Sequence, residues 1–549
     1  MVPRFRHGRA LIFNRVKNHS ARFVGLLALL GTTSLSAADA PAATTPASVA
    51  PATAPAVILT PKSPATPRLN GPKIFGVRPG VPFLYSIPAT GDRPMTFAAD
   101  GLPAGLTLDA PTGRITGALA QPGEFQTTLR ATNALGTAAK PLRIVVGEEI
   151  ALTPPLGWNS YNCFGERITQ DLALRAAHAL VKLGLDRHGW TYINMDDGWM
   201  GRQRGGPYHA LQADPQRFTD IKAMVDEIHS LGLKAGLYST PWTETYGGRL
   251  GGSSEKMDGN WPPLGAPDAA KNAKQLPFAI GQYRFTYQDA KQFSEWGFDY
   301  LKLDWGPVEA PETKEMHQAL RVAGRDIVLS LSNNHVKKLL PIIGEVGPWA
   351  QSWRTTTDIT DAWSRVANDI GFAQDPWAPY ARPGHYNDAD MLVVGQLGGR
   401  VPSQLHPSKL TPDEQYTHIS LWCLLTSPLL IGCDLEKMDD FTFGLLSNDE
   451  VLEVDQDPLC KQAVQVAGGR GPLKVYAKPL DDGSLAVGLF NTGPETATAT
   501  ASWADLKLTG PQRVRDLWRQ QDVGVFSDRF EAPVASHGVV LVRIFPTAP

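Results

Sequence analysis

Three short apolar runs of this 549-residue chain end in carboxylates, which are Asp304, Asp358 and the adjacent pair Asp196 and Asp197. An isolated carboxylate in the interior of a protein is unstable, because burial disfavours its charged form. Such residues are therefore expected at a polar site and not in a core. We predict that each run is a buried strand and that the carboxylates share one pocket.

Two cations lie close in the sequence to the first two carboxylates. Lys302 precedes Asp304 by two residues, so on a strand both side chains lie on the same face, where the lysine can lower the pKa of the acid or bind a substrate hydroxyl. Arg354 precedes Asp358 by four residues, a spacing that does not by itself bring the two groups into contact. The alternative interpretation is a salt bridge that closes a strand end without catalysis.

The pair Asp304 and Asp358 fits the cleavage of a glycosidic bond. This reaction needs a proton for the leaving oxygen and a carboxylate that stabilises or traps the cationic sugar carbon. The formal net charge is −2, and Lys and Arg form no run beyond the first residues. The sequence therefore gives no sign of a basic patch that would bind nucleic acid or an anionic membrane. A neutral carbohydrate is the expected partner. We expect no metal and no cofactor, because the four cysteines share no CxxC spacing and are predicted to be buried free thiols.

The elements that must position these residues repeat over roughly 300 residues. The predicted strands cover 192–196, 234–238, 300–304, 327–331, 352–357 and 427–431, and a helix is predicted over 220–231. Alternating strands and helices without a glycine-rich phosphate loop predict an α/β fold, a (β/α)₈ TIM barrel over 150–458. Catalytic residues of such barrels lie at the carboxyl ends of the strands, where Tyr238 and Ser332 also fall.

Segments of β character flank the predicted barrel. Period-two patterns separated by Gly and Pro predict a small immunoglobulin-like β-sandwich over 71–148, and an antiparallel β-sandwich over 460–549. Residues 39–70 are rich in Ala, Pro and Thr and are predicted to be an extended linker. Residues 1–38 combine a basic region, a short apolar run and small residues, which indicates a signal peptide and a secreted or periplasmic protein with no integral membrane segment after cleavage. An uncleaved amino-terminal anchor is the alternative.

Six motifs in a fixed order carry a family resemblance. They are GWNSY at 157–161, NMDDGW at 194–199, YLKLD at 300–304, WRTTTDITDAW at 353–363, PGHYNDADML at 383–392 and DQDPL at 455–459. This series resembles glycoside hydrolase family 27, the α-galactosidases and α-N-acetylgalactosaminidases. The resemblance covers about 152–460, and the carboxyl-terminal sandwich is also similar to that family's second domain. The segment 101–117 resembles immunoglobulin-like modules of bacterial secreted enzymes.

The resemblance implies an exo-acting α-galactosidase that works on oligosaccharides or polysaccharides by a retaining double displacement. In this mechanism Asp304 attacks the anomeric carbon, while Asp358 protonates the leaving group and then activates water, with the two carboxyl groups roughly 5–5.5 Å apart. Asp196 and Asp197 are implied to bind the 4- and 6-hydroxyls of galactose. Further implied sugar-contacting positions are Tyr161, Tyr238, Lys302 and Arg354.

Two alignments with the family are possible at the position that contacts the substituent on the second carbon of the sugar. In galactosidases of the family a Glu after the fifth strand reads the 2-hydroxyl, and N-acetylgalactosaminidases carry a Ser in its place. The loop 330–335 (SLSNNH) puts Asn333 there, or Ser332 after a shift of one residue. Either side chain is smaller than Glu and leaves room for an acetamido group, unless His335 refills the space.

Three other functions stay open at this point. One is α-N-acetylgalactosaminidase activity, through the small residues of the loop after the fifth strand. Another is β-L-arabinopyranosidase activity, which the retained acidic pair argues against because that pair suits a sugar with a hydroxymethyl group. The last is a catalytically inactive carbohydrate-binding protein, which the presence of both catalytic carboxylates argues against. The sequence gives no prediction of oligomeric state.

Other conspicuous residues are interpreted as structural. Asp388 and Asp390 belong to a later motif and are expected to support the site without taking part in catalysis. Trp190, Trp296 and Trp422 are expected to fill the core.

Overall fold

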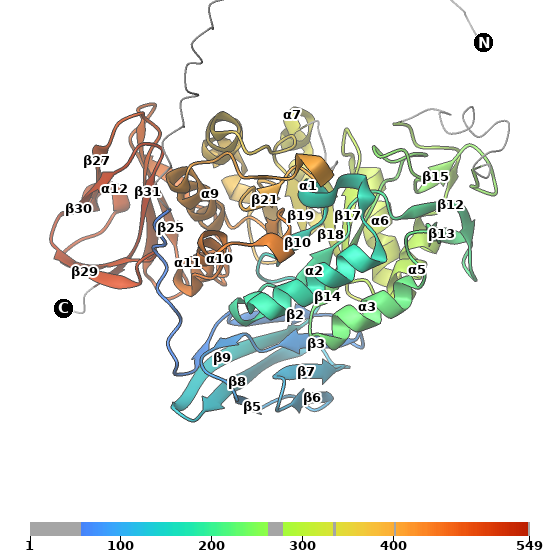
Figure 1. Cartoon of the computed structure of the whole chain (residues 1–549), viewed down its shortest axis with the longest axis horizontal. Coiled ribbons are helices and arrows are strands. Elements are labelled where there is room, and N and C mark those ends of the chain that lie inside the picture. Colours follow the sequence, from blue (N-terminus) through green and yellow to red (C-terminus); the bar gives the residue numbers. More distant parts are fainter. Residues whose placement is uncertain (1–55, 262–277, 333–335, 400–401, 547–549) are drawn as a thin grey trace, which may run out of the picture. The chain divides into compact units, whose positions relative to one another are not determined.

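A computed structural model describes residues 56–261, 278–332, 336–399 and 402–546 (Figure 1). The predicted signal peptide, most of the predicted linker, and the loop residues Asn333 and His335 lie outside the described residues.

Eight parallel strands form the centre of the molecule, in the order β20-β19-β18-β17-β14-β11-β10-β23. They are β10 (Leu156–Asn159), β11 (Tyr192–Asn194), β14 (Lys234–Ser239), β17 (Tyr300–Asp304), β18 (Val328–Ser332), β19 (Ser352–Arg354), β20 (Tyr386–Asp388) and β23 (Leu429–Ile431). The two ends of the sheet meet just after β20, where Leu392 forms a parallel bridge with Ile431. The amide of Leu392 donates to the carbonyl of Leu430 (2.8 Å), which closes the sheet. The predicted (β/α)₈ barrel is therefore confirmed.

Helices follow most of these strands, and Figure 1 shows α2, α3, α5 and α6 along one side of the barrel. The α-helices of this domain are α1 (Tyr161–Phe164), α2 (Gln170–Leu183), α3 (Ile221–Ser230), α5 (Thr286–Trp296), α6 (Ala310–Val322), α7 (Val336–Leu339), α8 (Ile343–Val346), α9 (Pro412–Leu425), α10 (Asp440–Leu446) and α11 (Asp449–Asp455). The predicted helix 220–231 is α3, and Asp220 caps it by accepting a hydrogen bond from the amide of Ala223 (2.9 Å).

The strands are shorter than the apolar runs suggest. The run 352–357 was predicted to be one strand, but β19 ends at Arg354. Thr355 makes the last bonds of the ladder, because its amide and its hydroxyl both donate to the carbonyl of Asp388, at 2.9 and 3.0 Å. Asp358 therefore lies on a loop four residues beyond the strand end, and not at the end itself.

The core confirms the interpretation of the tryptophans and cysteines. Trp190, Trp296 and Trp422 are buried in the main hydrophobic cluster, and all four cysteines are buried and free. No helix among the described residues combines the length and the apolar character needed to cross a bilayer.

The amino-terminal module is an immunoglobulin-like sandwich of two sheets, as predicted. One sheet has the order β2-β9-β8-β5, with β2 (Ile74–Val77), β9 (Gly136–Val146), β8 (Gly123–Asn133) and β5 (Thr96–Asp100); the other has the order β3-β7-β6, with β3 (Phe83–Ser86), β7 (Arg114–Gly117) and β6 (Leu106–Asp109). The module packs on the amino ends of the barrel strands (Figure 1). The hydroxyl of Ser86 donates to the carbonyl of Gly232 (2.7 Å), just before β14.

The carboxyl-terminal domain is the predicted antiparallel sandwich. A sheet of order β24-β25-β26-β31-β28-β29 faces the pair β27-β30; the strands are β24 (Val464–Ala467), β25 (Leu473–Pro479), β26 (Leu485–Asn491), β31 (Val539–Pro546), β28 (Gln512–Asp516), β29 (Gln521–Phe526), β27 (Ala497–Ser502) and β30 (Arg529–Val534). Helix α9 packs against β26 and β31, so this domain is attached to the barrel through that helix.

The described part of the predicted linker is not a free tether. The amide of Leu59 donates to the hydroxyl of Tyr416 (2.8 Å), and the hydroxyl of Thr60 donates to the carbonyl of Gly444 (2.7 Å). Residues 68–69 form β1 (Arg68–Leu69), which pairs with β4 (Ala89–Thr90). The Ala, Pro and Thr composition of residues 39–70 concealed this docking, because it is made by backbone groups and a few apolar side chains. In Figure 1 this segment is the blue coil that leads to the amino-terminal module.

Arg78 of the amino-terminal module fixes it to the barrel, and its loss is expected to lower stability without changing the affinity for substrate. Its guanidinium pairs with Asp326 (2.5 Å) and donates to the carbonyl of Arg321 (2.7 Å) at only 11% side-chain exposure. We expect Arg78→Ala to cost about 2 kcal/mol, because partly buried charged partners lose their bonds. The midpoint of urea unfolding and KM measure the two effects.

The matched control is Arg130→Ala in the same module. Arg130 pairs with Asp100 at 44% and 59% side-chain exposure, so its loss is expected to cost less than about 1 kcal/mol. Equal effects of the two substitutions would contradict the role given to Arg78.

Candidate active site

A cavity of about 510 Å³ opens at the carboxyl ends of the barrel strands. Eight of the ten predicted site residues line it: Tyr161, Asp196, Asp197, Tyr238, Lys302, Asp304, Arg354 and Asp358. They come from β14, β17 and β19 and from the segments that follow β10, β11 and β19. The prediction that separate strands contribute to one pocket is confirmed.

Asp304 is the last residue of β17 and is 8% exposed. The hydroxyl of Tyr238 donates to its Oδ2 (3.1 Å), while Oδ1 is buried and has no hydrogen-bond partner among the described residues. Burial raises the pKa of Asp304 to about 6, although the charge of Lys302 acts in the opposite direction. The carboxylate is thus held from one side only, which leaves one oxygen available to a ligand.

Lys302 contacts a different acid from the one that its sequence spacing suggested. Its ammonium lies 2.8 Å from Oδ2 of Asp196, which also accepts a hydrogen bond from the side-chain amide of Asn159 (2.9 Å). Lys302 acts on Asp304 only through its charge. The reason is that Asp196, which follows β11 two strands away in the sheet, offers a buried carboxylate within reach of the lysine.

Asp197 is buried and held by the loop that follows β14. The hydroxyl of Thr245 donates to its Oδ1 (2.8 Å), and the amide of Gly247 donates to its Oδ2 (2.6 Å). Burial nevertheless raises the pKa of Asp197 to about 7, and the charges of Asp196 and Asp304 act in the same direction. The carboxylates of Asp196, Asp197 and Asp304 therefore lie close enough to interact through their charges.

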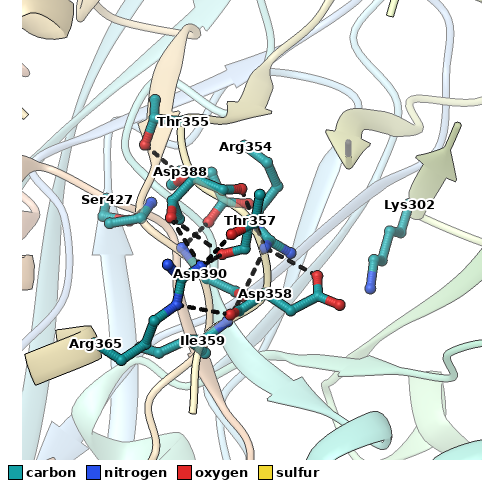
Figure 2. Close-up of polar contacts among 12 residues, drawn as sticks. Lys302, Arg354, Thr355, Thr357, Asp358, Ile359, Arg365, Asp388, Asp390 and Ser427 are labelled. Carbon is teal, nitrogen blue, oxygen red and sulfur yellow. Dashed lines mark hydrogen bonds and ion pairs between the residues drawn. The ribbon is translucent and has the colours of Figure 1, made fainter. Parts of the chain in front are cut away.

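Asp358 lies at the open side of the cavity, with 71% of its side chain exposed. The guanidinium of Arg354 contacts Oδ1 of Asp358 (3.2 Å) and also Oδ2 of Asp390 (2.7 Å), as Figure 2 shows. Partial burial raises the pKa of Asp358, but the charges of Arg354 and Lys302 outweigh it, and the net pKa is below its ordinary value. The contact between Arg354 and Asp358, which their spacing alone did not establish, is present.

Comparison with known proteins shows which family this chain resembles. The family model described as "Alpha galactosidase A" matches residues 153–261 and 271–457, more than half of the 549-residue chain. The chain belongs to the α-galactosidase family. This confirms the resemblance drawn from the six motifs.

Individual relatives of the α-galactosidase family agree with this assignment. The α-galactosidase of Coffea arabica is 37% identical over 417 residues, which are 75% of this chain and 98% of that protein. Alpha-galactosidase 2 of Arabidopsis thaliana is 37% identical over 402 residues, 72% of this chain and 90% of that protein. A crystal structure from Bacteroides fragilis, titled "putative alpha-galactosidase/melibiase", is 33% identical, covers 89% of this chain and 99% of its own, and has a TM-score of 0.76.

Two further models match the domains that flank the α-galactosidase barrel. "Alpha galactosidase C-terminal beta sandwich domain" matches residues 470–544, and "Putative Ig domain" matches residues 66–147.

Asp390 supports the loop that carries Asp358 and also lines the cavity of this α-galactosidase family member. Its Oδ2 accepts a hydrogen bond from the amide of Ile359 (2.7 Å) in addition to the ion pair with Arg354. Asp388 lies behind it, accepts the amide of Asp390 (2.8 Å), and has its pKa raised to about 6 by burial. The supporting role predicted for both residues agrees with these contacts.

The two remaining predicted residues do not join the others. Ser332 ends β18 in register with Asp304, but it is not among the described residues that line the cavity. Asn333 lies outside the described residues, so the alignment at this loop stays a prediction.

Several cavity residues were not identified from the sequence, among them Tyr246, Gln404 and His406. Tyr246 follows β14 on a glycine-rich loop, and a loop after a barrel strand is a usual source of site residues, so a usable signal existed. No such signal marks Gln404 and His406, which reach the cavity from the long connection before α9. Within the described ranges, no three His, Cys, Asp or Glu side chains group in a way that could hold a metal ion.

Proposed function

We propose that this protein is an exo-acting α-galactosidase that removes terminal α-linked galactose with retention of configuration. The observation that carries the proposal is the arrangement of one cavity at the carboxyl ends of the strands. It presents the pair Asp304 and Asp358 together with the second acidic pair Asp196 and Asp197. Membership of the α-galactosidase family supports the same reaction.

The proposed roles follow from burial and exposure. Asp304, deep in the cavity with an unpartnered oxygen, attacks the anomeric carbon and forms a covalent galactosyl-enzyme. Asp358, at the open side, reaches the leaving oxygen, donates a proton to it, and then removes a proton from the attacking water. Asp196 and Asp197 accept hydrogen bonds from sugar hydroxyls, and Lys302 donates one.

Two tyrosines form the apolar part of the proposed sugar site. The ammonium of Lys302 lies 5.8 Å from the ring centroid of Tyr161 and 5.6 Å from that of Tyr238. The two rings therefore flank the lysine in the cavity wall, where they are available to the carbon–hydrogen faces of a sugar ring.

The pH dependence of kcat/KM is expected to be bell-shaped with its alkaline limb near pH 6. The catalytic pair is productive when it holds one proton and that proton is on Asp358. Because burial raises the pKa of Asp304 to about 6, this is the less populated of the two singly protonated forms, and the last proton leaves the pair as pH rises through that pKa. The acid limb follows Asp358, whose pKa lies below its ordinary value under the charges of Arg354 and Lys302. The measurement is kcat/KM on a galactoside with a poor leaving group.

The control for the pH profile is Asp358→Ala, for which kcat/KM is expected to rise, not fall, as pH passes through about 6. In Asp358→Ala, an activated galactoside needs only ionised Asp304, so kcat/KM should rise with pH through a pKa somewhat below 6, because the charge of Asp358 no longer raises it. A wild-type profile that is flat around pH 6 would argue against Asp304 and Asp358 as the catalytic pair.

Assays on three p-nitrophenyl glycosides test the substrate directly, namely the α-galactoside, the α-N-acetylgalactosaminide and the β-L-arabinopyranoside. The proposal expects the first to be turned over with the highest kcat/KM. Turnover of none of them would refute the assignment as an enzyme. Preference for the second would assign recognition of the acetamido group to the position occupied by Ser332 or Asn333.

We also propose that the protein is exported, on the basis of the amino-terminal sequence alone. The basic region and apolar run within residues 1–38 support this proposal. Amino-terminal sequencing of protein recovered outside the cytoplasm tests it, since an intact Met1 there would contradict cleavage.

A further inference from the structure

The loop that carries Asp358 has little regular structure to hold it. It runs from the end of β19 at Arg354 to a π-helix, Arg365–Ile370. The side chain of Asp358 is 71% exposed, so packing does not fix its direction. The direction of the carboxyl group therefore depends on its contact with Arg354 (3.2 Å) and on the hydrogen bonds that hold the loop backbone.

Arg365 forms hydrogen bonds with the backbone of this loop, as Figure 2 shows. Its Nε donates to the carbonyl of Asp358 itself (3.0 Å), and its Nη2 donates to the carbonyl of Thr357 (2.5 Å). The same Nη2 also contacts the hydroxyls of Thr357 and Thr356. A planar guanidinium with fixed donor directions thus binds two successive carbonyls at the proposed acid/base residue.

We infer that Arg365 is a positioning residue for the acid/base step, an inference that rests on the role proposed for Asp358. Arg365 is not among the described residues that line the cavity, and it bonds to the backbone and hydroxyls of this loop, not to the carboxyl group of Asp358. Arg365 therefore affects the reaction in two ways, through its bonds to the backbone of Asp358 and through its own charge.

A second set of contacts holds the loop from the opposite, inner side. There Asp390 accepts the amide of Ile359 (2.7 Å) and pairs with Arg354 (2.7 Å), which in turn contacts Asp358. The contacts of Asp390 and Arg354 do not involve the carbonyls of Thr357 and Asp358, which accept hydrogen bonds from Arg365. The two sides together hold both peptide groups that flank the Cα atom of Asp358.

Arg365 stands where the loop ends and the π-helix begins. Arg365 is the first residue of the π-helix, and its amide donates to the carbonyl of Ala362 (2.9 Å). Short π-helical turns are rare and occur frequently at functional sites, where they shift a side chain from its α-helical direction. In this protein the π-helix begins at Arg365, the residue that bonds to the loop.

The charge of Arg365 adds a second, separable effect. Asp358 faces the cations Arg354, Lys302 and Arg365 and, across the cavity, the carboxylate of Asp304. Asp390 also lies near, but it is paired with Arg354. Removal of the Arg365 charge should move the acid limb of the pH profile to higher pH, whereas Lys at this position keeps the charge and should leave the limb in place.

The experiment compares Arg365→Ala and Arg365→Lys with wild type on two α-galactosides, one with a poor and one with an activated leaving group. For Arg365→Ala we expect kcat/KM to fall about 10- to 100-fold on the poor leaving group, as for a misplaced catalytic group. On the activated galactoside the change should stay within about threefold, because no proton is needed. Arg365→Lys, which can bind one carbonyl, should fall between wild type and Arg365→Ala on the poor leaving group.

The control variant is Asp369→Asn. Asp369 pairs with the other guanidinium nitrogen of Arg365 (3.3 Å) at 58% side-chain exposure, so its change removes an ion pair and leaves the carbonyl contacts in place. It should behave as wild type on both galactosides. The melting midpoint of each variant shows whether it is folded.

Two outcomes would overturn the inference: equal losses of Arg365→Ala on both galactosides, or no loss on either. Asp358→Ala, assayed in parallel, distinguishes failure of the proposed function from failure of the role given to Arg365. If Asp358→Ala shows no dependence on the leaving group, the proposed function itself fails. If it does and Arg365→Ala does not, only the role of Arg365 is wrong.

Discussion

Asp304→Asn is expected to abolish turnover of every α-galactoside, with a loss of kcat of about ten-thousandfold or more, as for other nucleophiles. The amide has nearly the same shape as the carboxylate and can still accept the hydrogen bond from Tyr238. It lacks the charge and the nucleophilic oxygen, so no galactosyl-enzyme forms. Steady-state kinetics on p-nitrophenyl α-galactoside measures the effect.

A nearby acid provides the control for Asp304→Asn. Asp361 also lines the cavity, but its side chain contacts Lys409 (3.6 Å) and His406 (3.7 Å) at the rim. Asp361→Asn is expected to stay within about tenfold of wild type, because it touches no reacting atom in the proposal. Comparable losses in both variants, or a fully active Asp304→Asn, would refute the assignment of the nucleophile.

Asp358→Ala is expected to divide substrates by their leaving groups. On galactosides with poor leaving groups kcat/KM should fall about 100- to 10,000-fold, which is the usual contribution of general acid catalysis. On dinitrophenyl α-galactoside it should stay within about tenfold, because that leaving group departs without a proton. The galactosyl-enzyme should then accumulate, since water also needs the base, and KM should fall with kcat.

Azide provides a positive test of the same variant. This anion attacks without general base help, so it should restore turnover of the dinitrophenyl substrate and yield a galactosyl azide of α configuration. Wild type should show no acceleration. Lack of rescue, or an azide product of β configuration, would contradict the role of Asp358 or the double displacement.

Much of the barrel could be predicted because its strands are buried on both faces and read as short apolar runs. Strands β10 and β20 were not predicted: LGWN and YND are too short and too polar to stand out. Their place follows only from pairing with neighbours in the closed sheet. The docked segment 56–67 was missed for a related reason, since backbone hydrogen bonds leave no mark on composition.

The site was predictable where a residue ends a strand, as Asp304 does, since topology alone then places it. Asp358 was recognised, but its place on a loop was not, because the run 352–357 reads as one strand whereas β19 ends at Arg354. The partner of Lys302 could not be derived either, since Asp196 lies 106 positions away in the chain. Arg365 gave no signal, because its partners are main-chain carbonyls.

The most direct test of the central claim is to trap the covalent intermediate. A fluorinated α-galactosyl fluoride, which forms the galactosyl-enzyme faster than water removes it, is incubated with wild-type enzyme, and the digested protein is analysed by mass spectrometry. We predict one labelled peptide that contains residues 300–306, with the sugar on Asp304. A label on any other carboxylate, or no label while the reagent is hydrolysed with inversion, would contradict the mechanism.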